Sequence, residues 1–267
     1  MTLFQADTAL RNPSPDEVIE FLGRDRPWSA YALGYLDPAA GVPTRVLGAE
    51  REGQIQALVV QAELPQLLSL YATGDPEAIA SVIQELPVPP ASGVFSIRAE
   101  AVDAFERHLR VSTAYRMRRM VIGRGELNNQ PMPGMVRLGL KDLEPVKRLY
   151  GLWTDSHQLP GQLSNGVYYG VYEGRELIAI AGTHCVSPTF GVGAIGNVLT
   201  HINDRNRGLA SATTTAVAEE LFRLGCDEIV LNVRHGNEVA YRCYARLGFR
   251  DHCTFVEGVF HSRLGRK

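Results

Sequence analysis

The stretch Arg205-Asn206-Arg207-Gly208-Leu209-Ala210 decides the fold, because it sets a basic, glycine-bearing loop at the start of a predicted helix. The run 194–200 before it has the pattern of a strand, and the apolar positions of 209–224 fall on one helical face. The first turn of a helix carries backbone N–H groups without partners and the positive end of the helix dipole. The order strand, loop, helix therefore predicts a pyrophosphate seat. Neither a P-loop nor a dinucleotide fingerprint is present, which argues against ATP and NAD.

A second motif follows this loop. Residues 229–233 have the pattern of the next strand, and Asn237-Glu238-Val239-Ala240-Tyr241-Arg242-Cys243-Tyr244-Ala245-Arg246-Leu247-Gly248-Phe249 that of a helix ended by its glycine. The two motifs resemble those of the Gcn5-related N-acetyltransferase (GNAT) superfamily, in which Q/R-x-x-G-x-G/A precedes an Asn, a Tyr and a Leu-Gly-Phe. Asn197-Val198-Leu199-Thr200 and Gly208-Leu209-Ala210-Ser211 are most similar to its FR47-like branch. The resemblance covers about residues 136–260.

The resemblance implies that acetyl-CoA is the acyl donor and that both motifs bind it. The strand end would pair with the pantetheine arm, the loop would bind the pyrophosphate through amides and arginines, and Asn237 would reach the arm from the other side. Tyr244 would protonate the departing thiolate, because a phenol and a thiol have comparable basicity, although packing in the core would also explain this tyrosine. The candidate catalytic residue is Tyr244, and the candidate cofactor-binding residues are Val198, Leu199, Thr200, Arg205, Asn206, Arg207, Gly208, Leu209, Ala210, Asn237 and Tyr244.

The general base is open at this point. Many members of the family carry a glutamate on the strand before the phosphate loop, but 194–200 contains no carboxylate. An ordered water, or an amine that binds already neutral, is a further alternative. The candidate side chains are His184, His201, His235, and Asp155 or His157.

Composition narrows the classes of partner. The 267 residues include 45% hydrophobic residues and carry a net charge of −2, without the basic field that nucleic-acid binding or an anionic membrane would require. No run is long and apolar enough to span a bilayer, so we expect a cytoplasmic protein with small-molecule partners. The four cysteines and seven histidines show no metal-ligand or disulfide spacing. We therefore expect neither a metal nor a cysteine nucleophile.

The chain is expected to hold two domains of one fold. Residues 123–135 are rich in Gly, Pro and Asn and have the composition of a linker. We predict a degenerate GNAT-like domain without a cofactor motif at 1–128, and an acetyl-CoA-binding catalytic domain at 129–267. In the first half the counterpart of the phosphate loop is Thr73-Gly74-Asp75-Pro76-Glu77, where a proline removes a donor and two carboxylates would repel a diphosphate. The fold class is α/β, with two tandem GNAT domains, each a mixed, mostly antiparallel twisted sheet flanked by helices.

The sequence also makes a prediction about the end of the first half and leaves the role of several aromatic residues open. In the first half, the pattern predicts a helix over 102–109 followed by a strand over 115–122. Several aromatic residues fit either an acceptor pocket or a core, and core packing is the commoner role of such residues. They are Trp28, Tyr31, Trp153, Tyr168 and Tyr169.

The sequence favours an N-acetyltransferase that moves an acetyl group from acetyl-CoA directly to a primary amine of a small molecule or peptide. Direct transfer follows from the lack of an evident cysteine nucleophile. One alternative is a non-catalytic acyl-CoA-binding or sensing protein, suggested by the missing strand carboxylate. Another is a longer-chain acyltransferase of the glycine N-acyltransferase type. Edge strands of such sheets also allow a homodimer.

Overall fold

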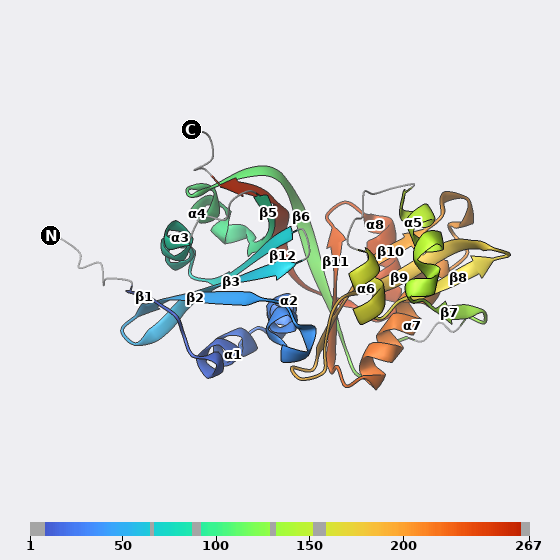
Figure 1. The fold of residues 1–267 in the computed structure, drawn as a ribbon, viewed down its shortest axis with the longest axis horizontal. Helices are drawn as coiled ribbons and strands as arrows, with labels where there is room; N and C mark the ends of the chain where they lie inside the picture. Colours follow the sequence, from blue (N-terminus) through green and yellow to red (C-terminus); the bar gives the residue numbers. More distant parts are fainter. Residues whose placement is uncertain (1–8, 65–66, 87–91, 129–131, 152–158, 263–267) are drawn as a thin grey trace. The chain divides into compact units, whose positions relative to one another are not determined.

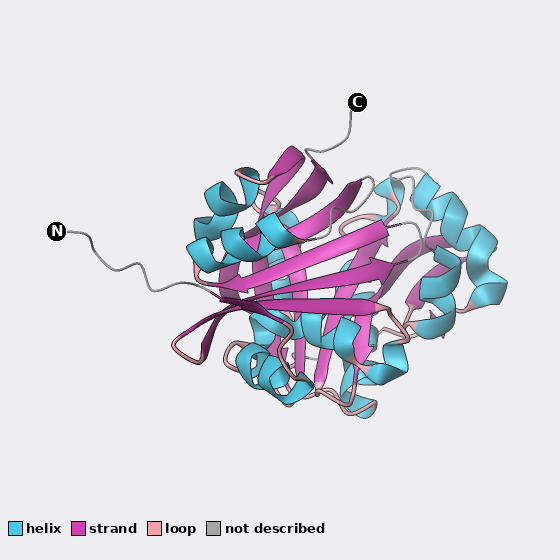
Figure 2. Cartoon of the chain, turned by 60° about the vertical axis from the view of Figure 1, so that its left-hand side comes forward, coloured by secondary structure: helices cyan, strands magenta, loops and turns pink. Residues whose placement is uncertain are grey.

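The computed structural model describes residues 9–64, 67–86, 92–128, 132–151 and 159–262. Contacts divide the chain into a first unit of Met1–Leu36, Gly41–Met117 and Thr254–Lys267, and a second unit of Asp37–Ala40 and Arg118–Cys253. Figure 1 labels the helices and strands along the chain, and Figure 2 shows helices lying against strands. The α/β fold class with a mixed sheet is as the sequence predicts.

The first unit is built on one sheet. Its elements are β1 (Ala9–Arg11), α1 (Pro15–Gly23), α2 (Arg26–Leu36), β2 (Thr44–Arg51), β3 (Gln54–Leu64), β4 (Leu67–Gly74), α3 (Pro76–Glu85), β5 (Ser92–Arg98), α4 (Val102–Glu106), and parts of β6 (Leu109–Gly123) and β12 (Arg250–Ser262). The strand order is β1-β2-β3-β4-β5-β12-β6. The β4–β5 pair is parallel, whereas β1–β2, β2–β3, β3–β4 and β5–β12 are antiparallel.

Alternating residues of β4 show how helices cover both faces of this sheet. Leu70 and Ala72 belong to a core with α3 and α4. Tyr71, between them, contacts α2 instead, where its ring lies 5.1 Å from that of Trp28. Because successive strand residues point to opposite faces, α3 and α4 cover one face and α2 the other. The Trp28 ring is almost fully buried and so is a core residue.

The second unit repeats this arrangement. Its elements are the rest of β6 and of β12, β7 (Met135–Arg137), α5 (Leu143–Gly151), α6 (Leu159–Asn165), β8 (Tyr169–Glu173), β9 (Glu176–Ser187), β10 (Val192–Thr200), α7 (Leu209–Arg223), β11 (Glu228–Arg234) and α8 (Glu238–Arg246). The strand order is β6-β11-β10-β9-β8-β7. The β10–β11 pair is parallel, whereas β9–β10, β8–β9 and β7–β8 are antiparallel.

Two helix layers also flank this second sheet. Ala181 on β9 packs with the cluster formed by α7 and α8, while its neighbour Ile180 packs with α5 and α6. Here we call these the α7/α8 face and the α5/α6 face. The buried residue Asp37 fastens the short segment 37–40 to this unit, because its carboxylate accepts hydrogen bonds from Ser187 Oγ at 2.6 Å and Thr189 Oγ1 at 3.2 Å.

The units divide at places that composition does not mark. The segment 124–128 is bound to the second unit, since Arg124 N donates to Asp227 O at 3.0 Å and Asn128 N to Leu247 O at 2.9 Å. The division at Met117 and Arg118 instead falls inside β6, and β12 returns to the first unit at Thr254. Contacts thus divide the chain within β6 and β12, and the domain boundary at residues 128 and 129 stays a prediction.

The sequence predicts a helix over 102–109, and the structure shows that this helix is shorter. Helix α4 ends at Glu106, and β6 begins at Leu109, six residues before the predicted strand start at 115. The first residues of β6 after Leu109 are mostly exposed, so they lack the alternation of apolar and polar residues that marks a half-buried strand.

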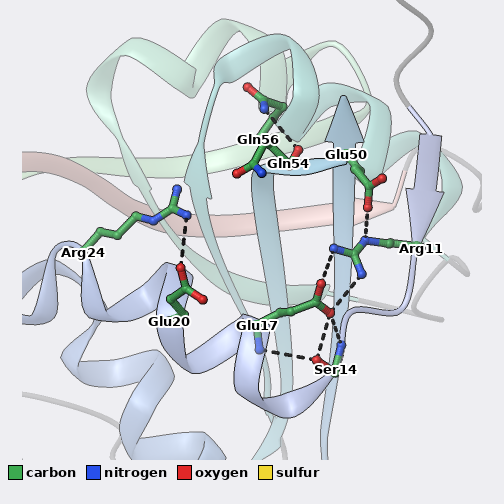
Figure 3. A network of polar contacts seen from close by, with 8 residues as sticks. All are labelled: Arg11, Ser14, Glu17, Glu20, Arg24, Glu50, Gln54 and Gln56. Carbon is green, nitrogen blue, oxygen red and sulfur yellow. Dashed lines mark hydrogen bonds and ion pairs between the residues drawn. The ribbon is translucent and has the colours of Figure 1, made fainter. Parts of the chain in front are cut away.

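A polar network fixes the start of the first unit (Figure 3). Arg11 on β1 donates to both carboxylate oxygens of Glu17 at 2.7 and 2.9 Å and forms an ion pair with Glu50 on β2. Ser14 caps α1, because its Oγ accepts from Glu17 N and its own N–H donates to the Glu17 carboxylate at 2.8 Å. The bonds from Arg11 and Ser14 lower the pKa of Glu17 from 4.5 to about 2.

We expect Glu17→Gln to lower the melting temperature at pH 7 more than Glu20→Gln, the same change on the same helix at a 3.9 Å surface pair with Arg24. A carboxylate with a lowered pKa stabilises fully above its unfolded value and loses that effect as the pH falls toward its folded value. The difference between the variants should therefore close between about pH 4.5 and about pH 2. Scanning calorimetry across this range measures it. Equal melting temperatures at pH 7 would contradict a stabilising network.

Candidate functional site

The two central strands of the second unit separate partway along their length. Parallel pairing joins Val192–Ile195 of β10 to Glu228–Leu231 of β11, although β10 runs on to Thr200 and β11 to Arg234. Beyond this point Leu199 and Thr200 still pair with β9, opposite Ile180 and Ala179. In the described residues, the last part of β10 therefore keeps one paired edge and leaves its other backbone edge available to a ligand.

An irregularity at Asn197 lies where the separation begins. The pairing of β10 with β9 shifts register between Gly196 and Leu199, and Asn197 has a φ of 54°. A left-handed conformation is unusual for a residue with a side chain, although asparagine tolerates it better than most. Such a bulge bends its strand locally and increases its twist.

Side chains from two helices and from the residue that precedes β8 hold Asn197 in this conformation. The Tyr150 hydroxyl donates to Asn197 O, while Asn197 Nδ2 donates to the Tyr168 hydroxyl at 2.7 Å and to Gln162 Oε1 at 3.2 Å. Burial raises the pKa of both tyrosines, so they remain protonated donors at neutral pH. The Tyr168 ring fits over Gly182, where a Cβ would overlap it. Tyr168 is thus a core residue that supports the site.

The predicted phosphate loop forms a turn that opens onto the start of α7. A 3₁₀ turn, Ile202–Asp204, precedes two left-handed residues, Asn206 at a φ of 63° and Gly208 at 77°. Gly208 is the N-cap residue and provides no side-chain cap. A Cβ at Gly208 would meet no atom closer than 3.9 Å, so its left-handed backbone, not crowding, requires glycine. The first N–H groups of α7 are left to a ligand or to solvent.

The arginines around this turn differ in the ion pairs that they form. Arg207 forms ion pairs with Asp204 and, at 3.1 Å, with Glu173, and these carboxylates raise its pKa. Arg205 is exposed on the same turn. Arg246, at the last residue of α8, makes no ion pair among the described residues.

A pocket of about 370 Å³ lies against the start of α7. It is lined by Met132, Arg207, Gly208, Ser211, Ala212, Arg246 and Leu247. Of these, Arg207 and Gly208 are predicted site residues, whereas Arg246, Ser211 and Met132 are additions from the structure. The second motif contains Arg246, but its spacing gives no sign that the end of α8 lies beside Gly208.

Tyr244 lies inside the cluster on the α7/α8 face. Its side chain is 8% exposed, and its ring lies 6.2 Å from that of Phe249. Burial raises the pKa of the Tyr244 phenol, which is therefore protonated at neutral pH. The neighbouring Cys243 places its Sγ 3.1 Å from Ser211 Oγ, a residue of the pocket. Tyr244 is thus a core residue one helical position away from a pocket contact.

Asn237 has a structural role that its motif also explains. It is the N-cap of α8, and its Oδ1 accepts from Ala240 N at 3.2 Å. The residue is exposed. Leu209, by contrast, is buried behind the loop against Ile178 and Ala179, so it anchors α7 to the sheet.

The candidate bases lie in separate places. His201 Nδ1 is 3.2 Å from Asp204 Oδ2 and accepts from Asn203 N, which makes it part of the loop. His235 is exposed in the turn between β11 and α8. His184 lies on β9, beside β10. Asp155 and His157, like the aromatic residue Trp153, lie outside the described residues.

The structure also bears on the expectations about cysteines, metals and membranes. Burial raises the pKa of the Cys226 thiol to about 11 and that of Cys185 to about 12, so both are protonated at neutral pH. In the described part of the chain, no three His, Cys, Asp or Glu side chains gather as a metal site. Within the same part, no helix has the length and apolar character needed to cross a membrane.

Comparisons with known proteins show which family part of the second unit resembles. Residues 168–256 match the model of the family described as FR47-like protein. This match confirms the resemblance carried by residues 205–210 and 237–249. Among proteins with curated functions, none matches the sequence.

Solved structures share the fold. A putative GNAT acetyltransferase from Novosphingobium aromaticivorans is 23% identical, with a TM-score of 0.56 over 72% of this chain and 84% of its own. A Drosophila protein is 12% identical, with a TM-score of 0.72 over 96% and 99% of the two chains. A tandem GNAT protein from the clavulanic acid biosynthesis pathway is 11% identical, with a TM-score of 0.54 over 96% and 98%. The tandem GNAT fold predicted from the sequence is therefore confirmed.

We expect Tyr168→Phe to lower the free energy of unfolding by about 1–3 kcal/mol, because it removes a buried acceptor of the Asn197 amide. The lower end is favoured, since Gln162 remains within reach of that amide. Tyr169→Phe is the matched control, as this adjacent ring is only half-buried. Chemical denaturation measures both. Equal stabilities would contradict a supporting role for the Tyr168 hydroxyl.

Proposed function

Because residues 168–256 are FR47-like and the fold is that of the GNAT superfamily, we propose that this chain is an N-acetyltransferase that uses acetyl-CoA. The observation that carries the proposal is the separation of β10 and β11 next to the uncapped start of α7. One feature offers backbone partners for an extended amide-containing arm, and the other offers donors for a diphosphate. An acyl-CoA contains both groups.

The pyrophosphate of acetyl-CoA would bind at the start of α7. The backbone N–H groups of Asn206–Ala210, together with the helix dipole, favour an anion at this point. Arg205 and Arg207 would add charge-assisted hydrogen bonds, although Arg207 must share its guanidinium with Asp204 and Glu173. We assign Arg246 to the same anion, because it lines the pocket beside Gly208.

The pantetheine arm would extend along the open edge of β10. Backbone groups of Val198, Leu199 and Thr200 would pair with its amides as an added strand does. Asn237 would contribute its amide Nδ2 from the opposite side, since its Oδ1 caps α8. This path leads the thioester from the phosphate loop toward the point where β10 and β11 separate.

Acyl transfer would then be direct. A neutral primary amine attacks the thioester carbonyl, and Tyr244 gives its proton to the departing thiolate. The Tyr244 phenol is protonated at neutral pH, as a general acid must be, while burial raises its pKa and so makes it a weaker acid than an exposed tyrosine. The raised pKa values of Cys185 and Cys226 argue against an acyl-cysteine intermediate at those residues.

We infer that the acceptor is a small amine or a peptide amine in the cytoplasm, and that the first unit is a degenerate copy without a donor site. The start of α3 supports the second inference: Asp75 Oδ1 accepts from Ala78 N at 2.9 Å and so caps the helix itself. A carboxylate at that position repels a diphosphate. An acyl-CoA sensor and a longer-chain acyltransferase remain the alternative functions, since both would use the same donor seat.

Calorimetric titration with acetyl-CoA tests the proposed acetyl-CoA-binding site. We expect binding to the wild type and none to Arg205→Glu combined with Gly208→Asp, because two anions then occupy the phosphate position. Arg246→Gln should weaken binding about tenfold through the loss of one charge-assisted contact. Arg242→Gln, on the same helix but outside the pocket, is the control. Circular dichroism establishes that each variant is folded. A wild type that does not bind acetyl-CoA would contradict the proposal.

Tyr244→Phe separates an enzyme from a sensor. We expect turnover of acetyl-CoA with a primary amine to fall by about 100-fold, since the general acid is lost. Affinity for acetyl-CoA should change little, because the ring and its packing on Phe249 are kept. Thiol release and calorimetry measure the two quantities. A wild type that binds acetyl-CoA but releases no thiol with any amine would favour the sensor.

A further inference from the structure

One histidine lies at the point where β10 leaves β11. A Cβ built on Gly196 would overlap Nε2 and Cδ2 of His184, so this edge of the imidazole lies directly over the Gly196 backbone. Gly196 comes immediately after Ile195, the last residue of β10 that pairs with β11. The ring of His184 therefore lies over the start of the separation.

We propose that His184 is the general base of the acyl transfer, an inference that rests on the function proposed above. The proposed donor path brings the thioester to this separation, and the attacking nitrogen must lie within hydrogen-bonding reach of its base. Because Gly196 has no side chain, the imidazole of His184 fits against its backbone. His184 is also exposed, so an amine can reach the ring from solvent.

The faces of the sheet assign different sides to the two proton transfers. Ile195 packs into the cluster on the α7/α8 face, which also contains Tyr244. Gly196, the next residue along the strand, directs its α-hydrogen side to the opposite face, where His184 lies. The base and the acid are thus on opposite faces of the sheet. This arrangement allows the amine to approach from one face while the sulfur leaves toward the other.

The other described candidates do not have this placement. His201 belongs to the phosphate loop and faces Asp204. His235 lies in the turn before α8, beyond the far end of β11. Desolvation by the protein around His184 lowers the pKa of its imidazole to about 4, although the side chain remains accessible. A lowered pKa keeps the ring neutral at pH 7, the form that accepts a proton.

The proposed step balances as follows. The amine lone pair forms a bond to the thioester carbonyl carbon, and a ring nitrogen of His184 takes a proton from that amine. The C–S bond then breaks, its electron pair goes to sulfur, and Tyr244 Oη gives the thiolate a proton. The products are the acetamide and free CoA. Solvent carries the proton from the imidazolium back to the tyrosinate.

The test uses the full chain and acetyl-CoA, with glycine, spermidine, benzylamine and a short peptide as acceptors. The amine that the wild type uses fastest serves for the variants. We expect His184→Ala to lower kcat/KM for the amine by about 100-fold or more, with the Kd of acetyl-CoA unchanged within about twofold. Added free imidazole should restore part of the rate, because the cavity then admits the missing base. A structural role would not give this rescue.

Two further variants keep the test decisive. Gly196→Ala keeps the imidazole but fills the space that it occupies, so we expect a comparable loss of turnover. His108→Gln, a change of a histidine in the first unit, should leave turnover unchanged. Full activity of His184→Ala, or a loss confined to His201→Gln or His235→Gln, would overturn the assignment while leaving the acetyltransferase function intact. A wild type that transfers acetyl to none of the amines would overturn both.

Discussion

The left-handed backbone of Asn197 is the constraint on which the second unit depends. The register shift of β10 at this residue lies directly after its last pair with β11, so the irregularity and the gap in the sheet occur at the same place. The Tyr150 and Tyr168 hydroxyls and the Gln162 amide hold this residue, so its conformation depends on α5, on α6 and on the residue before β8. Those elements therefore shape the site from the far face of the sheet. Two glycines near Asn197 make room for rings. Gly182 accommodates the ring of Tyr168, and Gly196 accommodates that of His184.

The two units differ in how the corresponding helix begins. Both contain a strand, a tight turn with a left-handed glycine, and a helix, at Gly74 before α3 and at Gly208 before α7. In the first unit Asp75 closes the helix with its own carboxylate. In the second unit the cap is the glycine itself, which leaves the N–H groups open. The difference lies in the residue at the helix start, which is an aspartate in the first unit and a glycine in the second.

Local sequence was informative wherever the chemistry is local. Residues 205–210 predicted the loop, and the helix predicted over 209–224 is found at Leu209–Arg223. The family match agrees with the two motifs. Features that depend on distant partners were not predictable. Arg246 reaches the pocket through the packing of α8 on α7, Asn197 is held by residues up to 47 positions away, and the exposed start of β6 carries no alternating pattern. The position of His184 over Gly196 was not predictable for the same reason, since no spacing shows which histidine lies there.

The return of β12 to the first unit has a consequence for how the protein is made. Phe260 packs edge-on against Phe105 in the core of that unit, and β12 pairs with β5 from Phe255 to His261. During synthesis, the ribosome releases residues 9–117 long before this strand emerges. The second unit has nearly all of its strands by then, so it can complete its sheet while the first unit still has an open edge and an unfilled core. The first unit therefore completes its sheet only after β12 has been made, and during synthesis its open strand edge is exposed for longer than that of the second unit.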